Sequence, residues 1–446
     1  MIFDTYIERG MKPLVEIGFM PEALSVNPQP YSHNWAPGDP YSDIYTGWRF
    51  PPDDYERWAE LIYQWVAHSI ERYGIDEVNT WYWELWNEPD ADYWGGTTEE
   101  YCKLYDYTAD AVKRALPSAI MGGPHVTGPA AERAAAFLRE FLDHCVSGKN
   151  YATGGNGAPL DFIAFHAKGA PRVVEGVVRM NMGRQLRNIS SGFEIVASYP
   201  ELKHLPIVIG ESDPEGCAAC PVSSYPQNAY RNGTMYSSYT AASFARKYDL
   251  ADHFGVNFEG AVTWAFEFEN QPWFAGFRDL ASNGVDKPVL NVFRMFGMMP
   301  EMRVEVSGDM AYDYLTICDE SVRGDQPDIG ALASKGAGTA SVMVWNYHDE
   351  DIIEEASPVM VSVAGIPAER VMLSHYRIDQ RLSNSYETWK TMGSPQNPTP
   401  EQYAELEQVG HLQMLTSPEQ METNRGEAVV TMKLPRQGVS LLVFEW

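Results

Sequence analysis

Trp81-Tyr82-Trp83-Glu84-Leu85-Trp86-Asn87-Glu88, followed at once by Pro89, is the stretch that decides the fold. An apolar and aromatic run of this length predicts a buried strand of a parallel sheet. Pro89 has no N–H to donate and therefore ends the strand. Asn87 and Glu88 are thereby placed at the carboxyl end of a buried strand, which is where an α/β barrel carries its chemistry.

A second carboxylate holds an equivalent position at the end of Leu205-Pro206-Ile207-Val208-Ile209-Gly210-Glu211. Counting strands places Glu211 three strands after Glu88, across the mouth of the same barrel. Glycoside hydrolysis needs two carboxyl groups that face each other, and retaining enzymes hold them roughly 5 to 5.5 Å apart. His166 and Trp264 also close strands, so both are predicted to face the mouth, with Trp264 as an aromatic platform for a sugar ring.

Strands and helices alternate over positions 1–300, which predicts a parallel sheet with right-handed crossovers. The predicted strands are Lys12–Gly18, Trp81–Glu88, Ala119–Gly123, Leu160–His166, Pro206–Gly210 and Gly260–Phe266. The predicted helices are Ile2–Arg9, Asp53–Tyr73, Thr98–Leu116 with Thr98 as its cap, Ala130–Val146, Met182–Tyr199 and Thr234–Phe254. This pattern indicates a TIM-type (β/α)8 barrel without its first two βα units. We expect those units to lie upstream, in roughly 60 to 80 further residues.

From about Pro300 the pattern changes to short β-rich segments separated by Gly- and Pro-rich turns. The predicted strands are Ser341–Tyr347, Val359–Val363, Val371–Ile378, Ala428–Leu434 and Val439–Phe444. Two domains follow, a catalytic barrel over 1–300 and an accessory antiparallel β-sandwich over 301–446. The polar segment Pro395–Gln420 is predicted to be a loop with one short helix.

Charge and cysteine content restrict the partners. The 446 residues carry a formal net charge of -28, which repels phosphate backbones and anionic membranes, so no nucleic-acid or membrane partner is expected. No run of about 18 apolar residues predicts a transmembrane helix, and any export signal would lie upstream of Met1. Cys217-Ala218-Ala219-Cys220 has redox or zinc spacing without a second pair nearby, so a loop disulfide or two free thiols is favoured over metal. No sequence signal indicates an oligomeric state.

Several motifs, taken in their order along the chain, resemble those of glycoside hydrolase family 39, the β-xylosidase family. The motifs are Gly10-Met11-Lys12-Pro13, Val15–Pro21, Trp86-Asn87-Glu88-Pro89, Asp161–His166, Pro206–Glu211, Gly276-Phe277-Arg278 and Asp286–Asn291. The resemblance implies that Glu88 is the acid/base, Glu211 the nucleophile and Asn87 the partner of the sugar 2-hydroxyl. His166 and Glu269 would hold other hydroxyls. No metal or other cofactor is expected.

Two departures from the family pattern bear on the substrate. Lys168 stands where members often carry Tyr, so we treat Lys168 as a substrate-binding candidate and leave the preferred sugar open. A further sugar-binding His of the family's first two strands has no counterpart here. The first hypothesis is a retaining exo-glycosidase that cleaves β-linked xylosides or a related β-glycoside. The alternative is a carbohydrate-binding protein of the same fold that has lost turnover, and a screen of aryl glycosides separates the two.

Overall fold

The main sheet of the N-terminal two thirds of the chain is parallel. The computed structural model describes residues 2–28, 47–265, 270–352 and 354–446. Six strands pair in the order β1-β2-β3-β4-β7-β8, each parallel to its neighbour. These strands are β1 (Leu14–Ile17), β2 (Tyr82–Leu85), β3 (Ile120–Val126), β4 (Phe162–Lys168), β7 (Pro206–Asp213) and β8 (Asn257–Ala261). Within the described ranges the sheet keeps two edges, β1 and β8, and the eight-stranded barrel stays a prediction.

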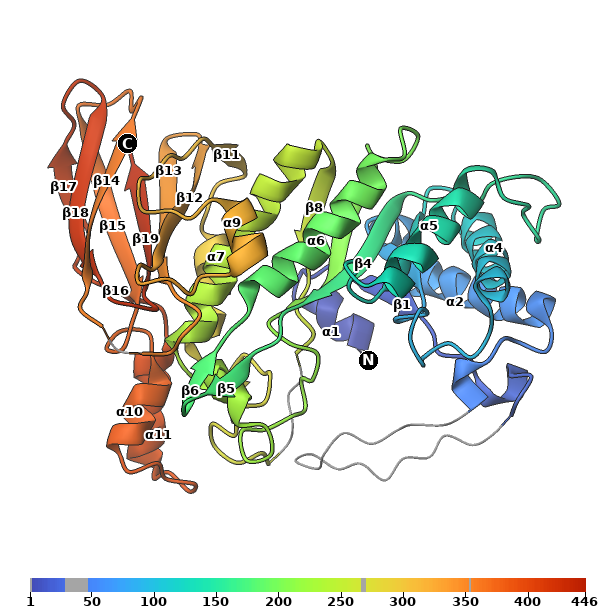
Figure 1. The fold of residues 1–446 in the computed structure, drawn as a ribbon, viewed down its shortest axis with the longest axis horizontal. Helices are drawn as coiled ribbons and strands as arrows, with labels where there is room; N and C mark the ends of the chain where they lie inside the picture. The colour runs from blue at the N-terminus through green and yellow to red at the C-terminus, as the bar shows by residue number, and fades with distance from the viewer. Residues whose placement is uncertain (1, 29–46, 266–269, 353) are drawn as a thin grey trace.

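Helices connect the strands as the sequence predicted (Figure 1). The long ones are α2 (Tyr55–Tyr73), α4 (Thr98–Ala115), α5 (Glu132–Ser147), α6 (Met182–Ala197) and α7 (Thr234–Phe254); α1 (Ile2–Glu8) and α3 (Ile75–Val78) are short. The predicted cap of α4 was wrong by one residue. Thr97 caps this helix, because its hydroxyl accepts from the Glu100 N–H while the Glu100 carboxylate accepts from the Thr97 N–H. No described helix has both the length and the apolar content needed to cross a membrane.

The last strand of the sheet differs from its prediction. Gly260–Phe266 was expected, whereas β8 begins at Asn257 and ends at Ala261, and positions 266–269 lie outside the described residues. Pairing with β7 ends at Val262, whose N–H donates to the carbonyl of Ile209. The Trp264 N–H then donates to the Asp213 carboxylate instead of to a strand carbonyl. At the end of β8 the buried Asp213 carboxylate therefore takes the place of a backbone carbonyl as the hydrogen-bond acceptor.

The two faces of the sheet have different characters. Strand geometry alternates side chains between the faces, so the register that pairs Leu14 with Tyr82 also pairs Glu16 with Glu84 on the same face. Leu14 and Tyr82 belong to a small apolar cluster with Phe162 and other residues. The opposite face packs into the main core under the helices. The carboxylates of Glu16 and Glu84 therefore lie two residues beyond Leu14 and Tyr82 on the same face of the sheet, which is the face that carries the polar chemistry.

Antiparallel strands form the C-terminal part of the chain, at the end of the molecule where β13 packs against α7 (Figure 1). One sheet contains β11 (Met302–Val304), β12 (Asp328–Gly336), β13 (Thr339–Tyr347), β15 (Arg370–Ile378), β16 (Gln413–Met414), β17 (Glu419–Glu422) and β19 (Val439–Glu445). A second sheet pairs β14 (Ser357–Ala364) with β18 (Glu427–Leu434), and its apolar side chains join those of the first sheet in one cluster.

The segment Pro395–Gln420 holds more regular structure than the predicted polar loop with one short helix. Its helix α11 (Pro400–Gly410) spans 11 residues, and β16 and the start of β17 follow it. Thr399 and Gln402 form a capping box at the start of α11, with proline at its first position. These start signals are present in the sequence, and the polarity of the surrounding segment concealed them. The other helices of this part are α9 (Tyr314–Glu320) and α10 (Ser385–Thr391), and α8 (Pro288–Gly297) precedes β11.

Candidate active site

A sharp turn after β2 positions Glu88. Trp86 and Glu88 both have positive φ, 69° and 45°, so the chain leaves the sheet immediately after Leu85. The buried Trp86 indole holds this turn by donating to the carbonyl of Tyr93 at 3.0 Å. The Glu88 N–H donates to the carbonyl of His125 at 3.0 Å. The turn therefore joins the ends of β2 and β3 and directs the Glu88 carboxylate toward β4.

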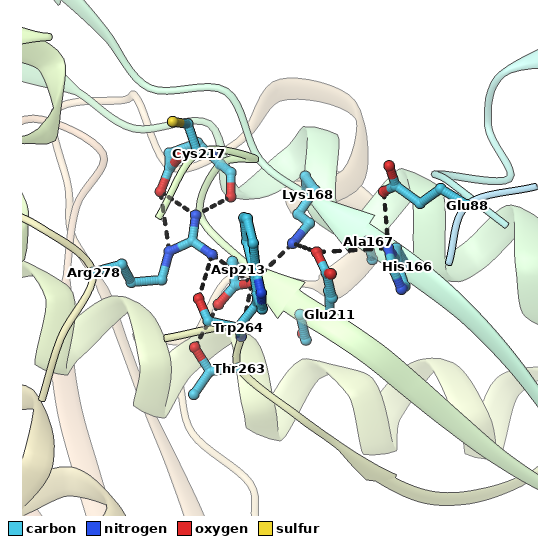
Figure 2. A network of polar contacts seen from close by, with 12 residues as sticks. Glu88, His166, Ala167, Lys168, Glu211, Asp213, Cys217, Thr263, Trp264 and Arg278 are labelled. Carbon is cyan, nitrogen blue, oxygen red and sulfur yellow. Dashed lines mark hydrogen bonds and ion pairs between the residues drawn. The ribbon is translucent and has the colours of Figure 1, made fainter. Parts of the chain in front are cut away.

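His166 and Glu211 lie side by side on β4 and β7, where they are partners in the sheet register. His166 Nδ1 is 2.9 Å from Glu88 Oε1 and 3.6 Å from Glu211 Oε2 (Figure 2). One carboxylate oxygen of Glu88, one of Glu211 and a ring nitrogen of His166 all lie within 4.8 Å of one another. The two carboxylates that the sequence singled out are thus brought together, with the imidazole between them.

Lys168 lies between two carboxylates of β7. Its ammonium forms ion pairs with Glu211 and with Asp213, the latter at 2.9 Å (Figure 2). Burial raises the pKa of Asp213, but the positive charges of Arg278 and Lys168 and the hydrogen bond from Thr263 together hold that pKa below its usual value. Asp213 therefore stays ionised and anchors Lys168 beside Glu211.

The pKa of Glu88 is lowered, whereas an acid catalyst must hold a proton before the reaction begins. Burial raises the pKa of Glu88, but the hydrogen bond from His166 and the positive charges of His166, Lys168 and His125 outweigh it and leave that pKa lowered. The like charge of Glu211 would by itself favour a protonated Glu88. However, Lys168 is paired with that charge, and His166 contacts the Glu88 carboxylate directly.

Two of the remaining predicted substrate residues, Asn87 and Trp264, lie in the described part of the chain. In the described part of the chain, the buried Oδ1 of Asn87 has no hydrogen-bond partner. Trp264 is 38% exposed, with its ring 5.8 Å from Lys168 Nζ and 6.0 Å from Arg278 Cζ. Glu269 lies outside the described residues. Asn87 and Trp264 can therefore contact a ligand that enters between the strand ends.

Sequence reasoning missed two buried groups below the site. Glu84 is fully buried on β2, and His125, 2% exposed at the end of β3, has its Nε2 at 3.1 Å from Glu84 Oε2. Burial raises the pKa of Glu84 to about 8; the charge of His125 opposes that rise, and Glu16 and Glu211 add to it. Glu84 was treated as part of an apolar strand, although its alternation with the tryptophans would have placed it on the face of the sheet that carries the polar chemistry.

The loop after β7 is fixed by buried ion pairs and a disulfide. Glu215 forms ion pairs with Arg231 and with Arg278, the latter at 2.6 Å. Burial raises the pKa of Glu215, yet the two guanidinium groups lower it to about 2. Cys217 and Cys220 are joined by a disulfide, which decides between the alternatives left by their spacing. With both sulfurs bonded to each other, neither is a thiolate that could bind zinc.

Comparisons with known proteins agree on one group of enzymes. The family described as "Glycosyl hydrolases family 39" matches residues 1–424. The chain is 25% identical over 460 residues to a β-xylosidase of Geobacillus stearothermophilus, covering 100% of this chain and 79% of that protein. It is 25% identical over 387 residues to the α-L-iduronidase of Mus musculus, covering 79% of this chain and 56% of that protein. The crystal structure of a monomeric β-xylosidase from Caulobacter crescentus shares the fold, with a TM-score of 0.74, 22% identity, and 99% and 83% of the two chains covered.

Proposed function

Because the chain belongs to glycosyl hydrolase family 39 and is therefore a glycoside hydrolase, we propose that it cleaves β-linked xylosides or a related β-glycoside from the chain end with retention of configuration. The observation that carries this proposal is the approach of the Glu88 and Glu211 carboxylate oxygens to within 4.8 Å. Inverting enzymes separate their carboxyl groups by roughly 6.5 to 9.5 Å to admit a water molecule, so the short separation supports direct attack on the sugar.

In the first step a Glu211 oxygen attacks the anomeric carbon, the bond to the leaving oxygen breaks, and Glu88 transfers its proton to that oxygen. In the second step Glu88 takes a proton from water, the water oxygen attacks the same carbon, and Glu211 is released as a carboxylate. The ion pair with Lys168 supports the role of Glu211 as an anionic nucleophile.

The neighbouring residues are assigned to substrate binding. Asn87 Oδ1 accepts from a sugar hydroxyl, Trp264 packs under the ring, and Glu269 holds another hydroxyl. His166, whose ring nitrogens contact Glu88 and His125, is assigned to position the Glu88 carboxylate beside the sugar. The same proposal assigns residues 1–300 to a catalytic (β/α)8-type barrel and residues 301–446 to an accessory β-sandwich. The shared apolar cluster of the two C-terminal sheets supports the sandwich.

A uronide is the second candidate substrate, and Lys168 is the observation that favours it. A sugar carboxylate requires a cation in its pocket, and the ammonium of Lys168 lies 5.8 Å from the exposed Trp264 ring. The relatives include α-L-iduronidases, whose name identifies a uronic-acid glycoside as their substrate. In this alternative the sugar carboxylate replaces Asp213 or Glu211 as a partner of Lys168.

Hydrolysis of aryl glycosides by matched variants tests the proposal. Glu88→Gln and Glu211→Gln keep the side-chain shape and should each lower turnover of an aryl β-xyloside by about 10²-fold or more. Glu132→Gln, on the exposed first turn of α5, serves as the control. An active parent with either site variant fully active would overturn the assignments. Preference for an aryl α-L-iduronide would favour the uronide, and oligosaccharide binding without release of any aglycone would favour a binding protein.

A further inference from the structure

A row of buried titratable side chains leads from Glu88 into the interior of the sheet. His166 Nδ1 is 2.9 Å from Glu88 Oε1, and His166 Nε2 is 3.2 Å from His125 Nδ1. His125 Nε2 is in turn 3.1 Å from Glu84 Oε2. Both nitrogens of each imidazole therefore lie close to a titratable side chain of this row. The contacts form an unbroken path of four groups from three neighbouring strands and the turn that follows β2.

We propose that Glu84, His125 and His166 form a proton relay that supplies the acid/base Glu88 with the proton it gives to the leaving group. The proposal rests on the function proposed above and adds His125 and Glu84 as positioning residues, which act through His166 without touching the substrate. An imidazole can accept a proton on one nitrogen while it releases one from the other. Among the described residues the two contacts of His166 are hydrogen bonds, whereas His125 Nε2 and Glu84 Oε2 lie close together without one, so Glu84 must turn its proton toward His125 before the transfer.

Protons balance along the path. The Glu84 carboxyl gives its proton to His125 Nε2, His125 Nδ1–H gives one to His166 Nε2, and His166 Nδ1–H gives one to Glu88. One proton thereby moves from Glu84 to Glu88, and both imidazoles return to the neutral form. When Glu88 later takes a proton from the attacking water, the same transfers in reverse restore Glu84.

Burial and charge make Glu84 a suitable source of that proton. Glu84 is 0% exposed, and neither of its oxygens receives a hydrogen bond among the residues that the structure describes. An ionised carboxylate without donors is costly in such a place, so the protonated form is favoured there. Glu88, in contrast, has a lowered pKa and would be largely ionised at neutral pH. The relay connects a group that holds a proton to one that must donate it.

Other charged groups face this path from each neighbouring strand. Glu16 of β1 has its Oε2 3.4 Å from His125 Nδ1 and competes with His166 for that nitrogen. Glu211 of β7 is 3.6 Å from His166 Nδ1, and Lys168 of β4 is paired with Glu211 and Asp213. Glu16, Glu211 and Lys168 are therefore the charged groups beside the two imidazoles that the path must pass.

Substrates whose leaving groups differ in their need for a proton distinguish a proton relay from a purely structural role of Glu84 and His125. Glu84→Gln keeps the size of the side chain and removes its exchangeable carboxyl proton, and His125→Ala interrupts the path. Each should lower kcat/KM about 10²-fold for an alkyl β-xyloside, whose leaving oxygen needs protonation, and less than about threefold for a dinitrophenyl β-xyloside, which needs none. The basic limb of the pH profile for the alkyl substrate should move to lower pH. His144→Gln removes a histidine that is paired with buried Asp106 outside this path, and it should leave kcat/KM unchanged for both substrates.

A loss that is equal for the two substrates, or no loss with an unchanged pH profile, would overturn the relay. A second measurement does not depend on activity. In Glu84→Gln the imidazole ¹⁵N chemical shifts of both His125 and His166 should change, because loss of the Glu84 carboxyl proton alters which ring nitrogen carries the hydrogen along the path. Unchanged His166 shifts would overturn the relay even if no aryl glycoside is cleaved, whereas inactivity of the parent protein with changed shifts would count against the proposed function alone.

Discussion

Replacing Gly210 by alanine should destabilise the protein by about 3 kcal/mol, at the upper end of the range for overpacked cores. A β-carbon at this position would lie 1.6 Å from His125 Nε2 and 2.4 Å from its Cε1, well inside van der Waals contact. His125 cannot move aside easily, because it is 2% exposed, has φ of 58° and contacts Glu84 and His166 through its two nitrogens. The imidazole or strand β7 must therefore shift.

Denaturant unfolding of four variants checks this magnitude. Gly260→Ala on neighbouring β8 is the matched control, since a β-carbon there meets no heavy atom within 4 Å, and it should change stability by no more than about 0.5 kcal/mol. In a His125→Ala background Gly210→Ala should cost only about 1 kcal/mol, so the single variants and the double variant together give a coupling energy of about 2 kcal/mol. Equal midpoints for Gly210→Ala and Gly260→Ala, or the same cost of Gly210→Ala with and without His125, would refute the packing argument.

Two further predictions concern buried charges away from the carboxylate pair. Burial lowers the pKa of Lys247 on α7 to about 7, whereas an unfolded lysine keeps its proton up to about 10.5. Lys247→Met should therefore stabilise the protein by at least about 1 kcal/mol, and by more at pH 6 than at pH 9. Thermal unfolding at the two pH values measures this gain in stability, and an equal or reversed gain would contradict the prediction. Glu215→Gln leaves Arg231 and Arg278 buried without their shared carboxylate and should cost about 3 to 5 kcal/mol in denaturant unfolding at pH 7, with Glu132→Gln as the neutral control. Because the folded pKa of Glu215 is about 2 against 4.5 for the free side chain, its contribution should be complete above pH 4.5 and disappear as pH falls toward 2, so the two proteins should converge in acid.

The strand ends were predictable because each one is encoded locally. Glu88 and Glu211 terminate apolar runs, and parallel strands bring their carboxyl ends to one edge of the sheet, so both carboxylates could be placed at one site from sequence alone. The six predicted helices were predictable for the same reason, and their ends agree with the structure to within two residues. The end of β8 was not, because it depends on the Asp213 carboxylate, which belongs to another strand and accepts the Trp264 N–H.

Side-chain partners within the site were harder to predict than positions. Lys168 was expected to bind substrate, and the structure pairs it with Glu211 and Asp213 on the neighbouring strand, two ion pairs that no local pattern encodes. His125 was overlooked because its place depends on the missing β-carbon of Gly210, 85 positions away in a strand two places along the sheet. Only the three-dimensional packing reveals that this histidine connects Glu84 with His166.

The ion pair of Lys168 has a consequence for how Glu88 would change roles during the proposed reaction. In the first step Glu211 becomes a neutral ester and its negative charge disappears, while Lys168 remains paired with Asp213 at 2.9 Å. Glu88 then faces an excess of positive charge, which favours its carboxylate form. A carboxylate is the form that accepts a proton from the attacking water, so the loss of one charge on β7 converts the acid of the first step into the base of the second. In the proposed reaction Lys168 therefore pairs with the nucleophile in the first step and promotes the change of role of Glu88 in the second.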